Sequence, residues 1–287
     1  MQNVDPVFML QPAVVIVVCT LLLVYWHSRR GFDPVVLAYS LVAYAVAIAM
    51  KYAVQLPTIS AVTSYFGQQS VGLGIYYGAQ TVFFEVGMAY VVASYAVSKR
   101  RLGVKDAEGY GAGLAFWENA ALLGALPLIN LAAYYAILST NTPLAQTVYN
   151  LLSQNSPGLF EPVSQALNSV ALGTLERFSS ILLHFAWGYL CVMAVVYSRR
   201  RLLIIALPMG LVDFLVPFAG TIGDVVFEGL VFTIGVAAVI VAWQAVKQVR
   251  EEVEKSSPHG SQAWETKSRA TKPLARNRLF PKQACCH

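Results

Sequence analysis

Long apolar stretches alternate with short polar connections along almost the whole chain. Seven of these stretches approach or exceed the roughly 20 residues that cross ~30 Å of hydrocarbon as a helix. A lipid-exposed backbone must satisfy its own polar groups, so such stretches predict membrane-spanning α-helices. We therefore expect an all-α, polytopic transmembrane bundle of about seven spans, or eight if a re-entrant or interfacial helix is counted. The predicted spans are 8–27, 34–56, 73–97, 110–138, 166–198, 200–219 and 225–247.

Two of the predicted spans are longer than one straight crossing requires. The fourth and fifth should tilt, kink or begin as interfacial helices, and Pro127 predicts a kink in the fourth. The connection 139–165 contains a short amphipathic stretch between helix breakers, and we expect it to lie along the membrane interface as a cap over the bundle. The connection 57–72 is expected to do the same.

Composition excludes an ordinary soluble domain and separates a tail from the membrane domain. The chain is 57% hydrophobic and only 12% charged, against about 25% charged residues in a typical soluble domain. Residues 1–247 are predicted to form the membrane domain. Residues 248–287 are polar, basic and poor in large apolar residues, which predicts a mostly disordered cytoplasmic tail beside anionic lipid. No aromatic–basic pattern supports nucleic-acid binding, so the lipid bilayer is the expected partner.

The positive charges lie in alternate connections and so predict the topology. The connections 57–72, 139–165 and 220–224 contain no Lys or Arg. With seven spans, all basic clusters fall on one side, which the positive-inside rule assigns to the cytoplasm. We therefore expect an extracytoplasmic N-terminus, a cytoplasmic C-terminus and a multi-pass location in the plasma membrane. The clusters are Arg29–Arg30, Lys99–Arg101 with Lys105, Arg199–Arg201, and Lys247 with Arg250.

The four cysteines do not imply a disulfide framework. Cys19 and Cys191 lie within predicted spans and are expected to be packing residues. The sequence Cys285–Cys286–His287 ends the tail. Metal binding or palmitoylation there and an inert terminus are both open.

Ionisable residues inside the predicted spans carry most of the functional information. A charge in the bilayer costs at least ~2.5–3.5 kcal/mol on insertion scales, so each one requires a reason. Asp224 and Glu228 lie at the outer edge of the last span, where water can reach them. The residues within spans are Lys51, Glu85, Glu118, Glu176, Arg177, His184 and Asp213.

Four of these residues are predicted to lie near one depth. Counted from the cytoplasmic end at ~1.5 Å per residue, Glu118 lies about 12 Å deep, Glu85 and Asp213 about 18 Å, and His184 about 21 Å. If they converge, these catalytic candidates could activate a water with a carboxylate base, or Glu85 and His184 could ligate a divalent metal. A proton or ion relay is a third possibility, and hydrogen-bonded packing groups are the structural alternative.

The remaining intramembrane charges are interpreted as supporting residues. Glu176 and Arg177 are expected near the outer boundary, in an ion-pair network. As sequence neighbours their side chains should diverge, so that each needs a partner on another helix. Lys51 is also placed close to that boundary, from which its ammonium could reach water.

Short strings around these residues resemble the YhfC-type family of membrane peptidases. The string VFFEVGMAY resembles the family's Glu-Glu-x-x-Arg-Tyr pattern through Glu85 and Tyr90, with Val86 and Ala89 in place of the second Glu and the Arg. The string LERFSSILLH retains the family's Glu-Arg and downstream His as Glu176, Arg177 and His184.

Two further strings extend the likeness, which covers most of residues 35–245. GAGLAFWE resembles Gly-x-Gly-His-Gly-x-x-Glu through Gly111, Gly113 and Glu118, with Leu114 for the His. MGLVD resembles His-x-x-x-Asp through Asp213, with Met209 for the His. The family is similar to type II CAAX prenyl proteases, PrsW-type proteases and the scaffold subunit of gamma-secretase. The resemblance implies a hydrolase, with the paired Glu and the histidines as catalytic equipment, of which this chain keeps one Glu of the pair and one His.

Three functions remain open from the sequence. The first is a glutamic or metal-dependent intramembrane peptidase, possessing either a full or a degenerate site, that acts on a membrane protein or peptide. The second is a non-catalytic membrane scaffold or assembly subunit, which the lost motif residues favour. The third is a small-solute or proton-coupled transporter, against which the absence of internal repeats argues.

Overall fold

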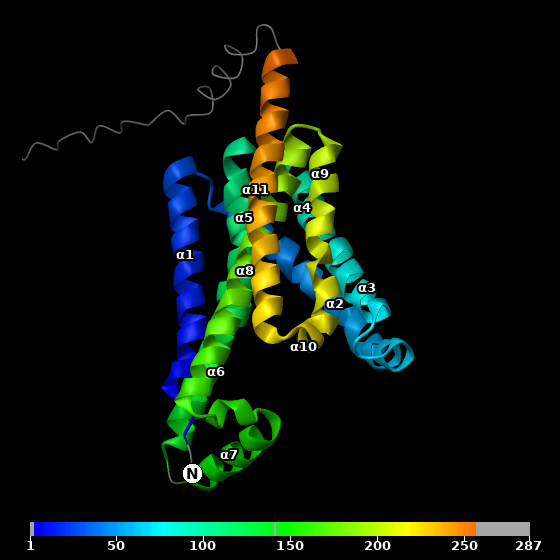
Figure 1. Ribbon diagram of the computed structural model, residues 1–287. Coiled ribbons are helices and arrows are strands. Elements are labelled where there is room, and N and C mark those ends of the chain that lie inside the picture. Colours follow the sequence, from blue (N-terminus) through cyan, green and yellow to red (C-terminus); the bar gives the residue numbers. More distant parts are fainter. Residues whose placement is uncertain (1–2, 141, 257–287) are drawn as a thin grey trace, which may run out of the picture. The chain divides into compact units, whose positions relative to one another are not determined.

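The computed structural model describes residues 3–140 and 142–256, and every regular element in these ranges is a helix (Figure 1). Seven helical segments are long and apolar enough to cross a membrane. The predicted all-α, polytopic fold is therefore confirmed. The segments are Pro6–Arg30, Val35–Phe66, Val71–Ser98, Val104–Leu138, Val163–Val196, Arg200–Ile222 and Asp224–Ser256.

Three segments are single α-helices, and the other four change helix type along their length. The single helices are α2 (Val35–Phe66), α8 (Val163–Val196) and α11 (Asp224–Ser256). The first segment joins η1 (Pro6–Met9) to α1 (Leu10–Arg30). The third consists of α3 (Val71–Gln80), η2 (Thr81–Val86) and α4 (Gly87–Ser98). The fourth consists of η3 (Val104–Asp106), α5 (Ala107–Ala115), η4 (Phe116–Ala125) and α6 (Leu126–Leu138), and the sixth of α9 (Arg200–Ala206), η6 (Leu207–Phe218) and α10 (Ala219–Ile222).

The helix α8 lies at the centre of the packing. In its most apolar 18-residue stretch, 78% of the residues are buried. The corresponding share is 39% or less in each of the other spans. Its closest neighbour is α5, because glycines remove the side chains between the two backbones. A Cβ at Gly111 would lie 2.4 Å from the carbonyl oxygen of Phe185, and one at Gly188 would lie 2.7 Å from the Cα of Gly111. The glycines of α5 and α8 thus let α5 pack closely against the helix that carries His184.

The second span is longer than the sequence indicated. We expected it to end at residue 56, before Pro57, and the connection 57–72 to lie along the interface. Instead α2 continues through Pro57 to Phe66. The Thr58 hydroxyl donates to the carbonyl of Val54 at 2.5 Å, within the turn that the proline disturbs. Such hydroxyls help a membrane helix to tolerate a proline. As a consequence Lys51 lies near the middle of the helix.

The fourth span is irregular just before Pro127. The π-helical η4 ends at Ala125, and Pro127 takes one of the first two positions of α6. A proline has no N–H to donate to the preceding turn, so it fits at a helix start better than within one. At the place where we predicted a kink, the structure therefore shows ten residues with a π-helical hydrogen-bonding pattern.

The connection between the fourth and fifth spans contains the predicted amphipathic element. It forms α7 (Pro143–Asn155) and η5 (Pro157–Phe160), and the Thr142 hydroxyl caps α7 by accepting from the N–H of Ala145 at 3.2 Å. Leu152 of α7 packs in a cluster with Val4 and Leu138. The neighbouring Leu151 is 60% exposed. Its location along a membrane interface stays a prediction.

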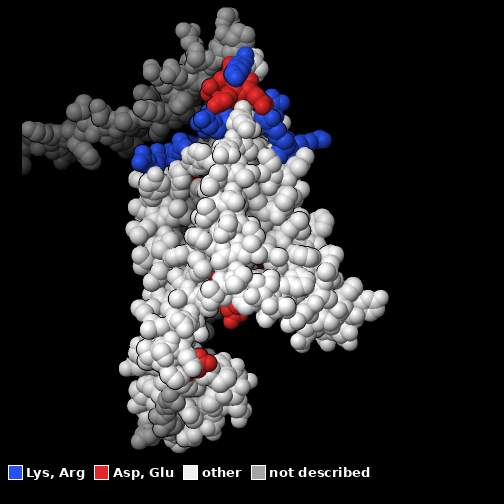
Figure 2. Space-filling view, in the orientation of Figure 1, with Lys and Arg blue, Asp and Glu red and all other residues white. Residues whose placement is uncertain are grey.

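Lys and Arg gather at one end of the surface shown in Figure 2. At that end α1 finishes with Arg29 and Arg30, and Arg199 precedes α9. Arg30 also pairs at 2.7 Å with Glu108, whose side chain is 1% exposed. The helix α11 runs on to Ser256, so residues 248–256 of the predicted tail are helical. The terminal sequence Cys285–Cys286–His287 lies outside the described residues.

Candidate metal centre

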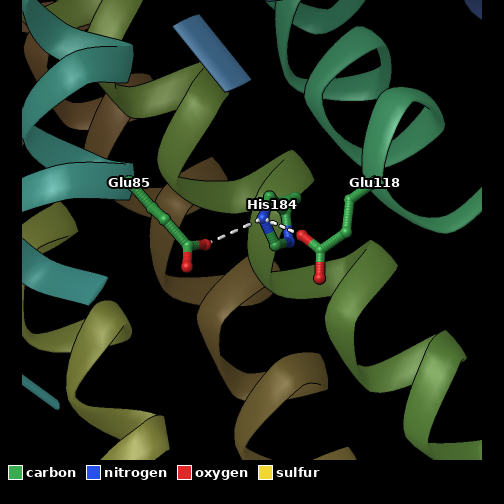
Figure 3. A group of neighbouring side chains, drawn as sticks. All are labelled: Glu85, Glu118 and His184. Atoms are coloured by element: carbon green, nitrogen blue, oxygen red, sulfur yellow. Dashed lines mark ion pairs between the residues drawn. The ribbon is translucent and has the colours of Figure 1, made fainter. Parts of the chain in front are cut away.

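Three of the four predicted catalytic residues converge on one point inside the bundle. His184 of α8 lies between Glu85 of η2 and Glu118 of η4 (Figure 3). Oε2 of Glu85 is 3.2 Å from Nε2 of His184, and Oε2 of Glu118 contacts the same nitrogen. One ligand atom from each residue lies within 4.8 Å of the other two.

Both glutamates lie on π-helical segments. Glu85 is in Thr81–Val86 and Glu118 is in Phe116–Ala125, whereas His184 is in a regular α-helix. π-Turns within α-helices are rare and occur frequently at functional sites. In η4 the amide of Asn119 donates to the carbonyl of Ala115 at 3.1 Å and to the Ser180 hydroxyl at 3.2 Å. This side chain therefore fills the irregular turn and joins it to α8.

The imidazole of His184 is held in one tautomer. Its Nδ1 lies 2.9 Å from the carbonyl oxygen of Ser180, which can only accept a hydrogen bond. Nδ1 therefore carries a proton, and when the ring is neutral Nε2 presents a lone pair. This is the usual arrangement of a metal-ligating histidine, whose other nitrogen donates to a carbonyl or carboxylate. The ring of Trp187, 4.2 Å away between centroids, packs beside it.

The unsatisfied atoms of the cluster fit a bound cation. Nε2 of His184 and Oε2 of Glu118 are buried and touch each other, yet neither makes a hydrogen bond of acceptable geometry. Buried polar atoms without partners are costly and rare. Two carboxylates and one imidazole lone pair directed to one point are donors that divalent metals accept. The residues present therefore fit a metal ion.

Lys51 belongs to this site, and its predicted position near the boundary was wrong. Its ammonium donates to Oε1 of Glu85 at 2.5 Å, to the Thr81 hydroxyl at 2.9 Å and to Oδ2 of Asp213 at 3.1 Å. The Thr81 hydroxyl donates in turn to Asp213. Asp213 therefore lies one step from the cluster, joined to Glu85 through Lys51. Ending the second span at Pro57 had placed Lys51 too near the surface.

The expected divergence of Glu176 and Arg177 was also wrong. The guanidinium of Arg177 pairs with its neighbour Glu176, and its other nitrogen lies 3.9 Å from Oε1 of Glu118. A long arginine side chain can turn back along the helix surface and reach both partners. Ser180 completes this side of the site, because its hydroxyl lies 3.3 Å from Oε1 of Glu118 and donates to it.

The cluster borders a cavity of about 140 Å³, named here the central cavity. Five carboxylic side chains, two cationic ones and His184 line it, so carboxylic groups are the most numerous ionisable groups of the lining. Glu228, which we had placed in water at the edge of the last span, is one of them, and its Oε2 is buried without a partner. The ionisable lining consists of Lys51, Glu85, Glu118, Glu176, Arg177, His184, Asp213 and Glu228.

Comparison with known proteins identifies the class. The sequence profile of the YhfC intramembrane metalloprotease family matches residues 14–241. The chain therefore belongs to this family, as its motifs indicated. No curated protein and no solved structure matches the chain.

The motif positions at which this chain departs from the family are apolar core positions here. Val86 and Ala89 are fully buried, and Leu114 and Met209 are 2% and 8% exposed. Two carboxylates and one histidine thus form the cluster, and the lost positions contribute packing. Motif comparison did not identify Lys51 as a site residue. The sequence feature that could have identified it is its position as the one charged residue in a long apolar segment.

Proposed function

We propose that this protein is a metal-dependent peptidase that cleaves membrane-embedded polypeptides, with Glu85, Glu118 and His184 holding one divalent cation. One observation carries the proposal: these ligand atoms meet inside the bundle, and two of them are buried without hydrogen bonds. Family membership supports the same reaction class.

The chemistry of peptide hydrolysis fits these residues. A bound divalent cation would supply Lewis acidity and lower the pKa of a coordinated water. Oε1 of Glu118 accepts only a 3.3 Å bond from Ser180 and lies 3.9 Å from Arg177. This oxygen takes the proton of the attacking water. As the water oxygen bonds to the carbonyl carbon and the C–N bond breaks, the same proton passes to the leaving nitrogen.

The other residues hold the ligands in place. The Ser180 carbonyl fixes Nδ1–H of His184, which keeps Nε2 directed at the cluster. Lys51 binds Oε1 of Glu85 and leaves Oε2 directed at His184. Asp213 therefore acts as a positioning residue rather than as a ligand.

No observation favours the scaffold or the transporter. A scaffold has no need for buried ligand atoms that make no hydrogen bond, because such atoms destabilise the fold. A transporter would be expected to show repeats or paired broken helices.

The proposed topology places the C-terminal end of the bundle in the cytoplasm and the protein in the plasma membrane. The supporting observation is the collection of Lys and Arg at one end of the structure (Figure 2). Cysteines introduced in α7 and at the α9 start, labelled with an impermeant thiol reagent on intact cells, test it. Labelling at α7 alone is expected, and labelling at α9 alone would reverse the topology.

The test of the metal centre measures metal content and cleavage together. The wild-type protein, purified without chelator, should contain about one divalent ion per chain. His184→Ala and Glu85→Gln should lower the metal affinity by more than the roughly 10-fold typical of an outer-partner loss, so that the purified variants contain far less than one ion per chain. Glu161→Gln, outside the cluster in the connection before α8, is the control and should retain the ion.

Cleavage is followed as new N-termini inside membrane-spanning segments of proteins in the same membranes. They should appear with wild type and Glu161→Gln, and disappear with His184→Ala. A wild-type protein that binds no divalent ion, or termini that persist with His184→Ala, would sink the proposed function.

A further inference from the structure

A second cavity adjoins the central one and has no role in the chemistry described so far. Its volume is about 260 Å³, and we name it the lateral cavity. It shares Lys51, Asp213 and Val216 with the lining of the central cavity. Its remaining lining residues are Ile48, Tyr52, Gln55 and Tyr77.

One ion pair contributes to the lining of both cavities. Lys51 and Asp213 lie 3.1 Å apart where the two cavities adjoin. Among the described residues, this pair is the only hydrogen bond or ion pair that joins α2 to η6. Tyr52 and Val216, on opposite walls, are 53% and 49% exposed. The lateral cavity therefore opens to the surface between α2 and η6, and the Lys51–Asp213 pair lies where it meets the central cavity.

The lateral cavity presents polar groups that have no partner. The Tyr52 and Tyr77 hydroxyls and the Gln55 amide make no hydrogen bond to any described residue. Tyr52 and Gln55 lie near the middle of α2, and Tyr77 lines the same cavity from α3. Lipid around such spans offers no hydrogen bonds. Ile48 and Val216 supply apolar walls between them. The lining thus combines donors and acceptors with apolar surface.

An unwound polypeptide segment in a membrane has the matching requirement. A peptide bond inside an α-helix is screened by its own turn, so a membrane-embedded substrate must unwind to be cleaved. Unwinding exposes backbone N–H and C=O groups that lipid cannot satisfy. An amide and two phenols in an otherwise apolar cavity can satisfy them.

We propose that the lateral cavity binds the locally unwound, extended segment of a membrane-embedded substrate, which enters between α2 and η6. The inference rests on the proposed peptidase function and names the site at which its substrate binds. Backbone groups of the segment pair with Tyr52, Gln55 and Tyr77. The scissile bond then passes the Lys51–Asp213 bridge to reach the cluster.

The test uses photo-crosslinking of a synthetic single-span peptide. The peptide has about 20 leucine and alanine residues, a central Gly-Pro pair that favours unwinding, and a diazirine side chain beside it. It is reconstituted in liposomes with the full-length protein, and the cross-linked positions are mapped by mass spectrometry. Cross-links are expected on the α2 and α3 residues that line the lateral cavity.

Two substitutions fill the lateral cavity without touching the central one. Ile48→Trp and Gln55→Trp should each lower the cross-link yield by about tenfold or more. Val42→Trp is the matched control, since Val42 is on the same helix, is 51% exposed and lines neither cavity. It should leave the yield unchanged. Each variant's metal content reports whether its core is intact.

The outcomes separate the two proposals. Unchanged yield in both filled variants with intact metal content, or cross-links spread over α1 and α11, overturns the substrate cavity and leaves the peptidase proposal standing. If one filled variant loses its metal, the other one decides. A wild-type protein without metal that still cross-links in the lateral cavity refutes the peptidase proposal and not the binding site.

Discussion

The two glutamates approach the same imidazole, but their surroundings differ. Oε1 of Glu85 lies 2.5 Å from the ammonium of Lys51, which also binds Thr81 and Asp213. Oε1 of Glu118 has a neutral hydroxyl at 3.3 Å and a guanidinium at 3.9 Å. Short charge-assisted bonds are about twice as strong as neutral ones. The Glu85 side is therefore the fixed half of the site, and the Glu118 side is the adaptable half.

This difference suits a division of labour within one cluster. A carboxylate such as Glu85, which must only hold its position, benefits from the connected group of Lys51, Thr81 and Asp213. A carboxylate that must take up and release a proton benefits from weaker contacts. Three predictions can break or sharpen this comparison.

The largest effect is expected when the fixed half loses its cation. Lys51→Met leaves the buried Glu85 and the partly exposed Asp213 without their counter-charge. Removing one partner of a buried ion pair costs about 3–5 kcal/mol, so the thermal midpoint of unfolding in detergent should fall strongly. Lys99→Met, at the end of α4 where Lys99 only lies over the Tyr95 ring, should change it little. A Lys51→Met protein as stable as wild type would contradict the assignment of a fixed half.

An intermediate effect is expected from the hydroxyl on the adaptable half. Ser180→Ala removes a donor to Glu118 and a hydroxyl 3.2 Å from Nδ1 of His184, but keeps the backbone carbonyl that binds the same nitrogen. Loss of an outer partner should weaken metal binding about 10-fold, measured by competition with a chelator. Ser179→Ala is the control, because that hydroxyl donates only to the Leu175 carbonyl. Equal affinities in the two variants would show that Ser180 does not hold Glu118.

The smallest effect is expected from Arg177→Met. Its partner Glu176 is 48% exposed and its second partner, Glu118, is 3.9 Å away. Partly exposed pairs contribute about 1 kcal/mol or less. The unfolding midpoint should therefore change much less than in Lys51→Met. If Arg177→Met proves the more damaging of the two, the adaptable and fixed halves have been assigned the wrong way round.

The seven spans were predictable because a hydrocarbon core requires helices of a certain length and apolar composition. Both properties can be read directly from the sequence. Counting residues along straight helices placed Glu85, Glu118 and His184 near one depth. Whether they meet depends on how the helices are rotated about their axes, which the spacing left open. Lys51 was misplaced because Pro57 was taken as a helix end, and no local pattern records the Thr58 hydroxyl that supports the disturbed turn.

Helix type was not predictable at all. The π-turns of η2 and η4 and the 3₁₀ geometry of η6 depend on contacts between helices, such as the close approach of Gly210 to the backbone of Val82. Hydrophobic periodicity averages over such turns. The roles of Glu176, Arg177 and Asp213 likewise depend on side-chain reach, which spacing alone does not determine.

The π-turns make the site sensitive to chain length as well as to residue identity. A π-turn closes its hydrogen bonds one residue later than an α-turn, and each residue turns an α-helix by about 100°. Losing a single codon within Thr81–Val86 or Phe116–Ala125 would let the helix return to α-geometry and rotate one side of the segment relative to the other. A glutamate could then be retained in the gene and still be lost from the cluster. Alignments of relatives should therefore be read for gaps at these two places.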